Sequence, residues 1–109
     1  MELTNSKLKK LYIRLLSIVY LILMGDLLEF YGTNCPHCVK MAPLIERLEE
    51  QGMKLERYEV WHNAQNAEML KKFDKGFCGG VPFFFNKKSG KWICGSTTWD
   101  KFLAWAQGK

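Results

Sequence analysis

The sequence lacks the features that mark several simpler classes of small protein. Its four cysteines are too few for the disulfide scaffold of a secreted mini-protein, and only Cys35 and Cys38 are closely spaced. No internal repeat or linker is present. Of the net charge of +5, residues 1–25 carry +3 and the remainder +2, so the presumed folded body is close to neutral and has nothing that resembles the clustered basic side chains of a nucleic-acid-binding surface. With 48% hydrophobic and 25% charged residues, the 109-residue chain predicts one globular domain with its own core.

An apolar run long enough to cross a bilayer is also missing. A membrane span needs about 20 apolar residues, whereas the run here covers residues 15–24 and follows Arg14. No small-residue cleavage site follows, as a removed signal peptide would require. Apolar side chains recur at helical spacing over residues 7–24. We therefore predict an amino-terminal helix within residues 1–25 that packs on or leads into a domain at 26–109. A short membrane anchor is the alternative, and a cleaved signal is a third possibility.

The rest of the chain alternates between strand and helix patterns. A helix between the first two strands implies a right-handed parallel crossover, and the turn NKKSGK joins the last two strands into an antiparallel hairpin. Pro43 should kink its helix, and Thr97 and Asp100 have capping-box spacing. We predict an α/β fold, with a four-stranded mixed sheet covered by helices on both faces. The predicted strands are 26–31, 55–61, 81–85 and 92–95, and the predicted helices are 36–51, 63 or 66–73 and 99–107.

The stretch LLEFYGTNCPHC places Cys35 at the junction of a predicted strand and helix. Pro36 suits the first helical position, so the Cys35 sulfur should face unpaired N–H groups and the positive end of the helix dipole. Such positions lower a cysteine pKa from about 8.5 to roughly 3.5–7.5. We therefore expect Cys35 to be an outer, attacking thiol and Cys38 a shielded thiol that resolves the mixed disulfide. His37 would stabilise the thiolate further if its imidazole lay near Cys35; alternatively it is simply an exposed residue of the first turn.

Several motifs together make residues 26–109 resemble the thioredoxin superfamily. They are the apolar strand LLEFYGTN, the pair CPHC at a helix start, Pro43 five residues after the second cysteine, the tripeptide Gly80-Val81-Pro82, and the strand ending ICGS before a capped helix. The Pro-His dipeptide and the acid on the strand are most similar to DsbA-type thiol oxidases. The chain has no room for the large helical insertion of those enzymes, and its size and order are similar to thioredoxin itself.

The resemblance implies a thioredoxin-like fold and dithiol-disulfide exchange with protein substrates. It implies a reductase or oxidase as redox partner and no metal or organic cofactor. Glu29 would be a buried acid that accepts a proton from Cys38; alternatively it is a core acid paired with Lys54 or Arg57. A non-catalytic binding or scaffold module that keeps the fold is the rival interpretation.

The resemblance also implies that the Val81-Pro82 bond is cis. Gly80, Val81 and Pro82 would then lie beside the cysteines, where an extended substrate could pair with the backbone. Trp61 ends the second predicted strand, at the sheet edge where ligands gather in open α/β folds, and could shape the substrate groove. A packed aromatic residue is the alternative for Trp61.

Cys78 and Cys94 have no motif spacing, and we interpret them as plain core cysteines. A second disulfide, a regulatory thiol or, with the CPHC pair, a four-cysteine zinc site are the alternatives. A monomer is expected. The lack of a clear export signal favours a cytoplasmic location, and a membrane-anchored extracytoplasmic protein is the alternative.

Overall fold

The computed structural model describes residues 25–109, and the helix predicted at 7–24 lies outside the described residues. The strand order is β2-β1-β3-β4; β1 is parallel to β2 and antiparallel to β3, and β3 and β4 form an antiparallel hairpin. The α/β class and the four-stranded mixed sheet are therefore confirmed. The elements are β1 (Leu27–Tyr31), α2 (Pro36–Glu50), β2 (Glu56–Glu59), α3 (Ala64–Asp74), β3 (Phe83–Asn86), β4 (Trp92–Cys94) and α4 (Trp99–Ala106).

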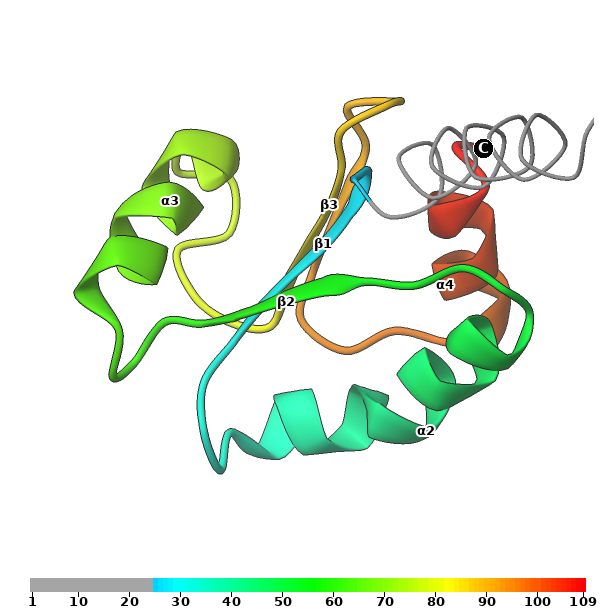
Figure 1. Ribbon diagram of the computed structural model, residues 1–109, viewed down its shortest axis with the longest axis horizontal. Coiled ribbons are helices and arrows are strands. Elements are labelled where there is room, and N and C mark those ends of the chain that lie inside the picture. The colour runs from blue at the N-terminus through cyan, green and yellow to red at the C-terminus, as the bar shows by residue number, and fades with distance from the viewer. Residues whose placement is uncertain (1–24) are drawn as a thin grey trace, which may run out of the picture.

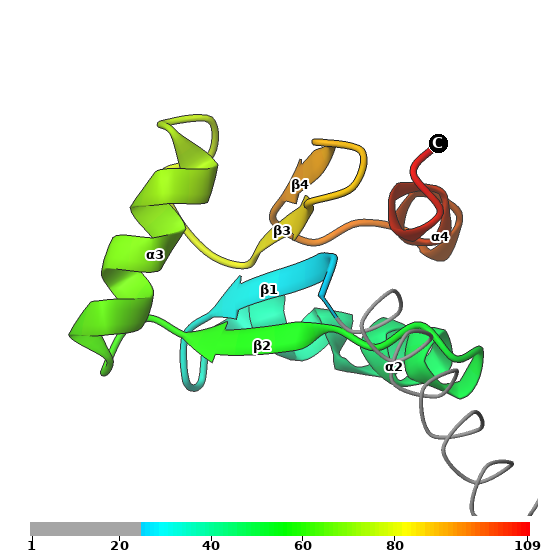
Figure 2. The same ribbon diagram turned by 45° about the horizontal axis from the view of Figure 1, so that its top comes forward.

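Helices cover both faces of the sheet, as predicted. Figures 1 and 2 show α3 on one side and α2 with α4 on the other. Alternation along β1 explains both cores, because successive side chains of a strand point to opposite faces. Leu27 packs with the buried residues of α2 and α4, whereas Leu28 and Phe30 pack with residues of α3. The buried side chains of the α2/α4 face are Leu27, Met41, Ile45, Leu48, Leu55, Phe84, Phe102 and Trp105.

Several predicted boundaries and one predicted cap differ from the structure. The second strand ends at Glu59 rather than at residue 61, because the chain turns there and the Trp61 ring lies over Gly32. The third strand begins at Phe83, after the Val81-Pro82 peptide. The predicted capping box is wrong: residue 98 is the N-cap of α4 and makes no side-chain cap hydrogen bond.

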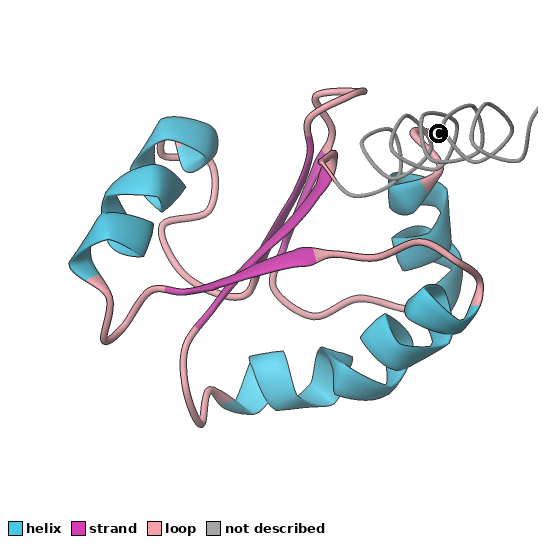
Figure 3. Cartoon of the chain, viewed as in Figure 1, coloured by secondary structure: helices cyan, strands magenta, loops and turns pink. Residues whose placement is uncertain are grey.

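The parallel pairing of β1 and β2 brings three connections to one end of the sheet. The loops that follow β1 and β2 leave from their carboxyl ends, and the loop that enters β3 arrives at the same end because β3 is antiparallel to β1. Figure 3 shows these loops in pink between the magenta strands and the cyan helices. Within residues 25–109, none of the helices combines the length and apolar character needed to cross a membrane.

Candidate dithiol site

A tight turn after β1 delivers Cys35 to the start of α2. The Cys35 N–H donates to the Gly32 carbonyl at 3.2 Å, and Asn34 has a φ of 64°, a left-handed conformation that asparagine tolerates better than most residues. Cys35 is the N-cap of α2, and Pro36 occupies the first turn, where its missing N–H costs nothing. The predicted position of the pair at a strand-helix junction is confirmed.

The Cys35 sulfur has two partners. It accepts a hydrogen bond from the Cys38 N–H at 3.3 Å. It also lies 3.9 Å from the Val81 carbonyl oxygen, a contact to which the thiol donates. Cys35 is 3% exposed and Cys38 is 6% exposed, so both thiols are buried and their exposure does not distinguish an outer from an inner one. As the N-cap of α2, Cys35 directs its sulfur toward the first turn of the helix, where it also lies beside the Val81 carbonyl.

Cys38 has a strongly stabilised thiol form. Burial, with the adjacent Cys35 thiol, raises the pKa of Cys38 to about 12. A thiol with this pKa keeps its proton at neutral pH. Nucleophilic use of Cys38 therefore needs a neighbouring base.

Glu29 lies on β1, on the face covered by α2, and its side chain is 0% exposed. Its Oε1 pairs with Arg57 at 3.1 Å, so the core ion pair considered from the sequence is present with Arg57. Oε2 has no hydrogen-bond partner. It is the only buried side-chain nitrogen or oxygen within residues 25–109 without one. Burial raises the pKa of Glu29 against the opposing effect of Arg57. The carboxyl group therefore has a free oxygen and a raised proton affinity, and its charge acts on Cys38.

The loop that enters β3 forms the other wall of the site. The Val81-Pro82 bond is cis, as predicted, and Gly80 is exposed in the same loop. Asp74 is buried at the end of α3, and its two carboxylate oxygens accept the N–H groups of Cys78 and Gly79 at 2.7 and 2.8 Å. Asp74 thus fixes the path of the chain toward Val81.

Trp61 and His37 differ in their contact with the turn. Trp61 is 54% exposed, and its ring lies so close to Gly32 that a Cβ there would be 2.2 Å from Cδ2. Trp61 is therefore both a packed aromatic and a surface at the rim of the site. His37 is exposed in the first turn of α2, in agreement with the plainer of its two interpretations.

Cys78 and Cys94 form a disulfide, so their interpretation as plain core cysteines is wrong. The disulfide joins the loop before Val81 to the edge strand β4. The four-cysteine zinc site is excluded, because disulfide-bonded sulfurs cannot act as thiolate ligands. Within residues 25–109 no group of three or more His, Cys, Asp or Glu side chains is arranged to hold a metal ion.

Sequence reasoning missed three residues that shape the site: Gly32, Glu59 and Asp74. Asp74 had a local signal, since an acid before the glycine-rich stretch KGFCGG suits capping of loop amides. Gly32 and Glu59 had none, because their contacts come from residues distant in the sequence.

A scan against models of known protein families finds no match for this chain, and neither does a search of curated proteins. The roles of the site residues therefore rest on their geometry.

Proposed function

We propose that the chain is a thiol-disulfide oxidoreductase with a thioredoxin-like fold that exchanges its Cys35-Cys38 pair with protein substrates. One observation carries the proposal: the Cys35 sulfur caps α2 and accepts the Cys38 N–H, while a buried carboxyl group with a free oxygen lies under the same helix. The strand order, the cis Val81-Pro82 bond and the position of the pair at a helix start support the resemblance in fold.

In the reducing direction the Cys35 thiolate attacks one sulfur of a substrate disulfide. The Cys35-substrate bond forms, the substrate S–S bond breaks, and the leaving thiolate takes a proton. Cys38 then loses its proton to Glu29 and attacks the Cys35 sulfur, so that the Cys35-Cys38 bond forms and the Cys35-substrate bond breaks. The second substrate thiolate leaves and takes a proton from solvent, and Glu29 releases its own proton to solvent. The substrate gains two electrons and two protons, and the pair becomes a disulfide. Oxidation of a substrate dithiol follows the same steps in reverse, and a partner reductase or oxidase restores the pair.

The Val81 carbonyl supports the choice of an extended polypeptide as substrate. It borders the Cys35 sulfur at 3.9 Å, and Gly80 leaves the adjoining backbone exposed. An extended chain that approached Cys35 would meet main-chain groups with which it could pair. The exposed Trp61 ring adds apolar surface at the rim.

The first test compares the full chain with Cys35→Ser in insulin reduction and in reoxidation of reduced ribonuclease. Serine keeps a side-chain oxygen for the N-cap, so the variant should fold. We expect wild type to be active in at least one assay and Cys35→Ser in neither. Equal rates for the two proteins would overturn the proposal.

The second test concerns Glu29 and its raised pKa. A carboxyl group whose pKa is raised on folding contributes stability below its unfolded pKa, near 4.5, and that contribution is lost as the pH rises through the folded pKa. Glu29→Leu should therefore be more stable than wild type at neutral pH, by about 1–3 kcal/mol. The difference should vanish in acid, which supplies the control. Release of the reduced substrate from the mixed disulfide should slow in the same variant; an unchanged release rate would remove Glu29 from the mechanism.

A binding or scaffold module is the second candidate, because both sulfurs of the pair are nearly inaccessible. Such a module would hold its pair reduced and unreactive. Alkylation of the native full chain by iodoacetamide, followed by peptide mapping, distinguishes the two functions: fast labelling at Cys35 fits exchange, and protection of both cysteines fits the module.

The Cys78-Cys94 disulfide favours the extracytoplasmic alternative for location, because disulfides persist in oxidising compartments and are rare in the cytosol. Thiol titration of the chain recovered from its own compartment under alkylating conditions would test this. Four reactive thiols after denaturation would favour the cytoplasm; two or none, according to the redox state of the Cys35-Cys38 pair, would favour an oxidising compartment.

A further inference from the structure

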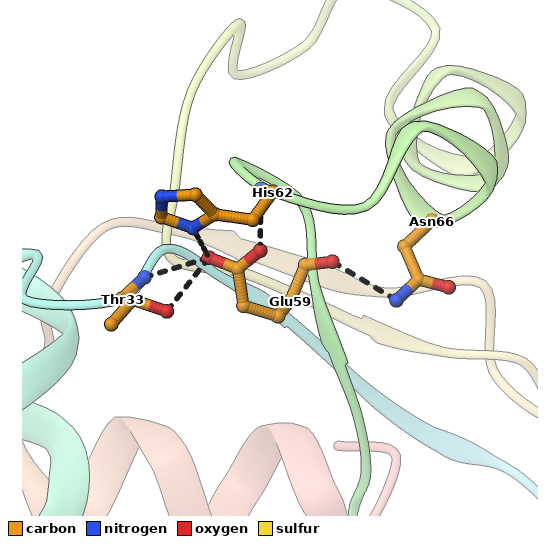
Figure 4. A network of polar contacts seen from close by, with 4 residues as sticks. All are labelled: Thr33, Glu59, His62 and Asn66. Carbon is orange, nitrogen blue, oxygen red and sulfur yellow. Dashed lines mark hydrogen bonds and ion pairs between the residues drawn. The ribbon is translucent and has the colours of Figure 1, made fainter.

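A carboxylate from outside the cysteine motif holds the turn that precedes Cys35. Figure 4 shows Glu59 Oε2 accepting both the backbone N–H of Thr33 at 2.8 Å and its hydroxyl at 3.0 Å. Glu59 is the last residue of β2, and Thr33 lies in the loop after β1, 26 residues earlier in the sequence. One carboxylate oxygen at the end of β2 thus binds both the backbone amide and the hydroxyl of Thr33.

Glu59 is also bound by two residues that follow β2, one of which lies in α3. Glu59 Oε1 accepts the His62 N–H at 2.7 Å, the His62 ring nitrogen Nδ1 lies 3.2 Å from Oε2, and the Glu59 carbonyl accepts the Asn66 side-chain amide at 2.9 Å. Loss of solvent around the group would raise its pKa, but the hydrogen bonds from His62 and Thr33 outweigh this and hold the pKa of Glu59 down to about 2. The acceptor is therefore a carboxylate at any pH near neutral.

The position of Thr33 determines the position of Cys35. Only Asn34 separates them, and it is held in the left-handed conformation, while the Cys35 N–H is bound to the Gly32 carbonyl. The Trp61 ring, two residues after Glu59, lies against Gly32 on the same turn. The turn is therefore held at Thr33 by the last residue of β2 and at Gly32 by the Trp61 ring, two residues later.

We propose that Glu59 is a positioning residue for Cys35: by binding Thr33 it fixes the turn that aligns the Cys35 sulfur between the Cys38 N–H and the Val81 carbonyl. The inference rests on the proposed function, since it concerns the rate at which that sulfur reacts. Glu59 makes no contact with the sulfur and acts through the backbone. Its loss frees the Thr33 amide and hydroxyl to bind water and lets the turn move against the start of α2.

The test measures the second-order rate of mixed-disulfide formation at Cys35 with an aromatic disulfide reagent, on the full chain under conditions where circular dichroism shows every variant folded. Glu59→Ala should react about tenfold more slowly than wild type, because displacement of a reacting group by about 1 Å costs up to roughly a hundredfold. Glu59→Gln retains an acceptor oxygen and should fall between them. The matched control is Glu56→Gln on the same strand, whose carboxylate accepts the Tyr58 hydroxyl and does not contact the turn; it should react like wild type.

A double-mutant cycle separates positioning from general destabilisation. Thr33→Val removes the hydroxyl donor alone and should slow the reaction by a smaller factor than Glu59→Ala does. In the Glu59→Ala background it should have no further effect on the rate, because the shared contact is already lost. Additive effects, or a Glu59→Ala rate equal to that of wild type, would overturn the inference. Those outcomes leave the proposed function intact if wild type still reduces or oxidises protein substrates, whereas an inactive wild type would remove the function itself.

Discussion

The two loops that border the cysteine pair are fixed by different kinds of bond. The turn at residues 32–35 is held by hydrogen bonds to Glu59 and by contact with the Trp61 ring. The loop at residues 75–82 is held by hydrogen bonds to Asp74 and also by a covalent bond from Cys78 to β4. The turn that carries Cys35 is thus held without a covalent bond, whereas the loop proposed to pair with the substrate is held by a disulfide. We expect the first to respond to small perturbations and the second to resist them.

The largest effect should come from removing the covalent bond. Cys78→Ser combined with Cys94→Ser opens a crosslink with a sequence separation of 16, and we expect a loss of about 3 kcal/mol in the free energy of unfolding because the unfolded chain gains freedom. Urea unfolding of the two proteins measures it. Cys35→Ser is the matched control, since it removes a sulfur from the other loop and keeps an N-cap oxygen, and it should cost far less. Similar costs for the two would contradict the contrast between the loops.

The next effect tests the packing of the first loop. Gly32→Ala would place a Cβ 2.2 Å from the Trp61 ring, and we expect a loss of about 2 kcal/mol from this overpacking. Because the clash is with one side chain, Trp61→Ala in the same chain should recover most of the loss. Gly80→Ala serves as the control in the second loop, where no atom lies within 4 Å of the added carbon. Thermal unfolding of all four proteins completes the comparison; an unchanged Gly32→Ala would show that the ring does not restrain the turn.

A smaller effect is expected where hydrogen bonds and the disulfide act together. Asp74→Asn leaves one acceptor oxygen for the two N–H groups of Cys78 and Gly79, so we expect a loss of about 1 kcal/mol. Amide hydrogen exchange at those two residues should speed up while the disulfide stays closed. Glu68→Gln, on the same helix with its exposed Lys71 pair, should change stability by less than about 0.5 kcal/mol. If exchange at the two amides did not change, Asp74 would not hold the loop.

The smallest effect is the pH dependence of the first loop. The pKa of Glu59 is lowered from 4.5 to about 2 on folding, so its contribution to stability is present above pH 4.5 and is lost as the pH falls toward 2. Wild type should therefore lose more stability than Glu59→Gln over that interval, in unfolding measured at a series of pH values. The double serine variant at Cys78 and Cys94 should show the same pH dependence as wild type. A parallel pH response in wild type and Glu59→Gln would mean that Thr33 does not depend on the carboxylate.

The sequence predicts what local patterns determine. Apolar runs located all four strands of the sheet to within a few residues, and Asn63, one of two residues considered for the start of α3, is its N-cap. Pro36 beside Cys35 correctly indicated that the cysteine begins a helix. These features depend on neighbours within one turn or one strand.

The rest depends on contacts between residues far apart in the chain. In the sequence, Glu59 is an ordinary polar residue at the end of a predicted strand. Only the parallel pairing of β1 with β2 brings it to Thr33. Cys78 and Cys94 lack motif spacing because the β3-β4 hairpin, and not a local turn, brings them together. The burial of Cys35 follows from the approach of Val81, which belongs to another loop.

The N-cap of α2 has one more consequence. The sulfur of Cys35 is at once the atom proposed to react and the acceptor for the Cys38 N–H in the first turn of the helix. Any bond formed at that sulfur takes away part of its electron density, so the chemistry of the pair and the fraying of the first helical turn are thermodynamically linked. The Cys38 amide should then exchange with solvent at a rate that depends on the redox state, and it would report that state without any added probe.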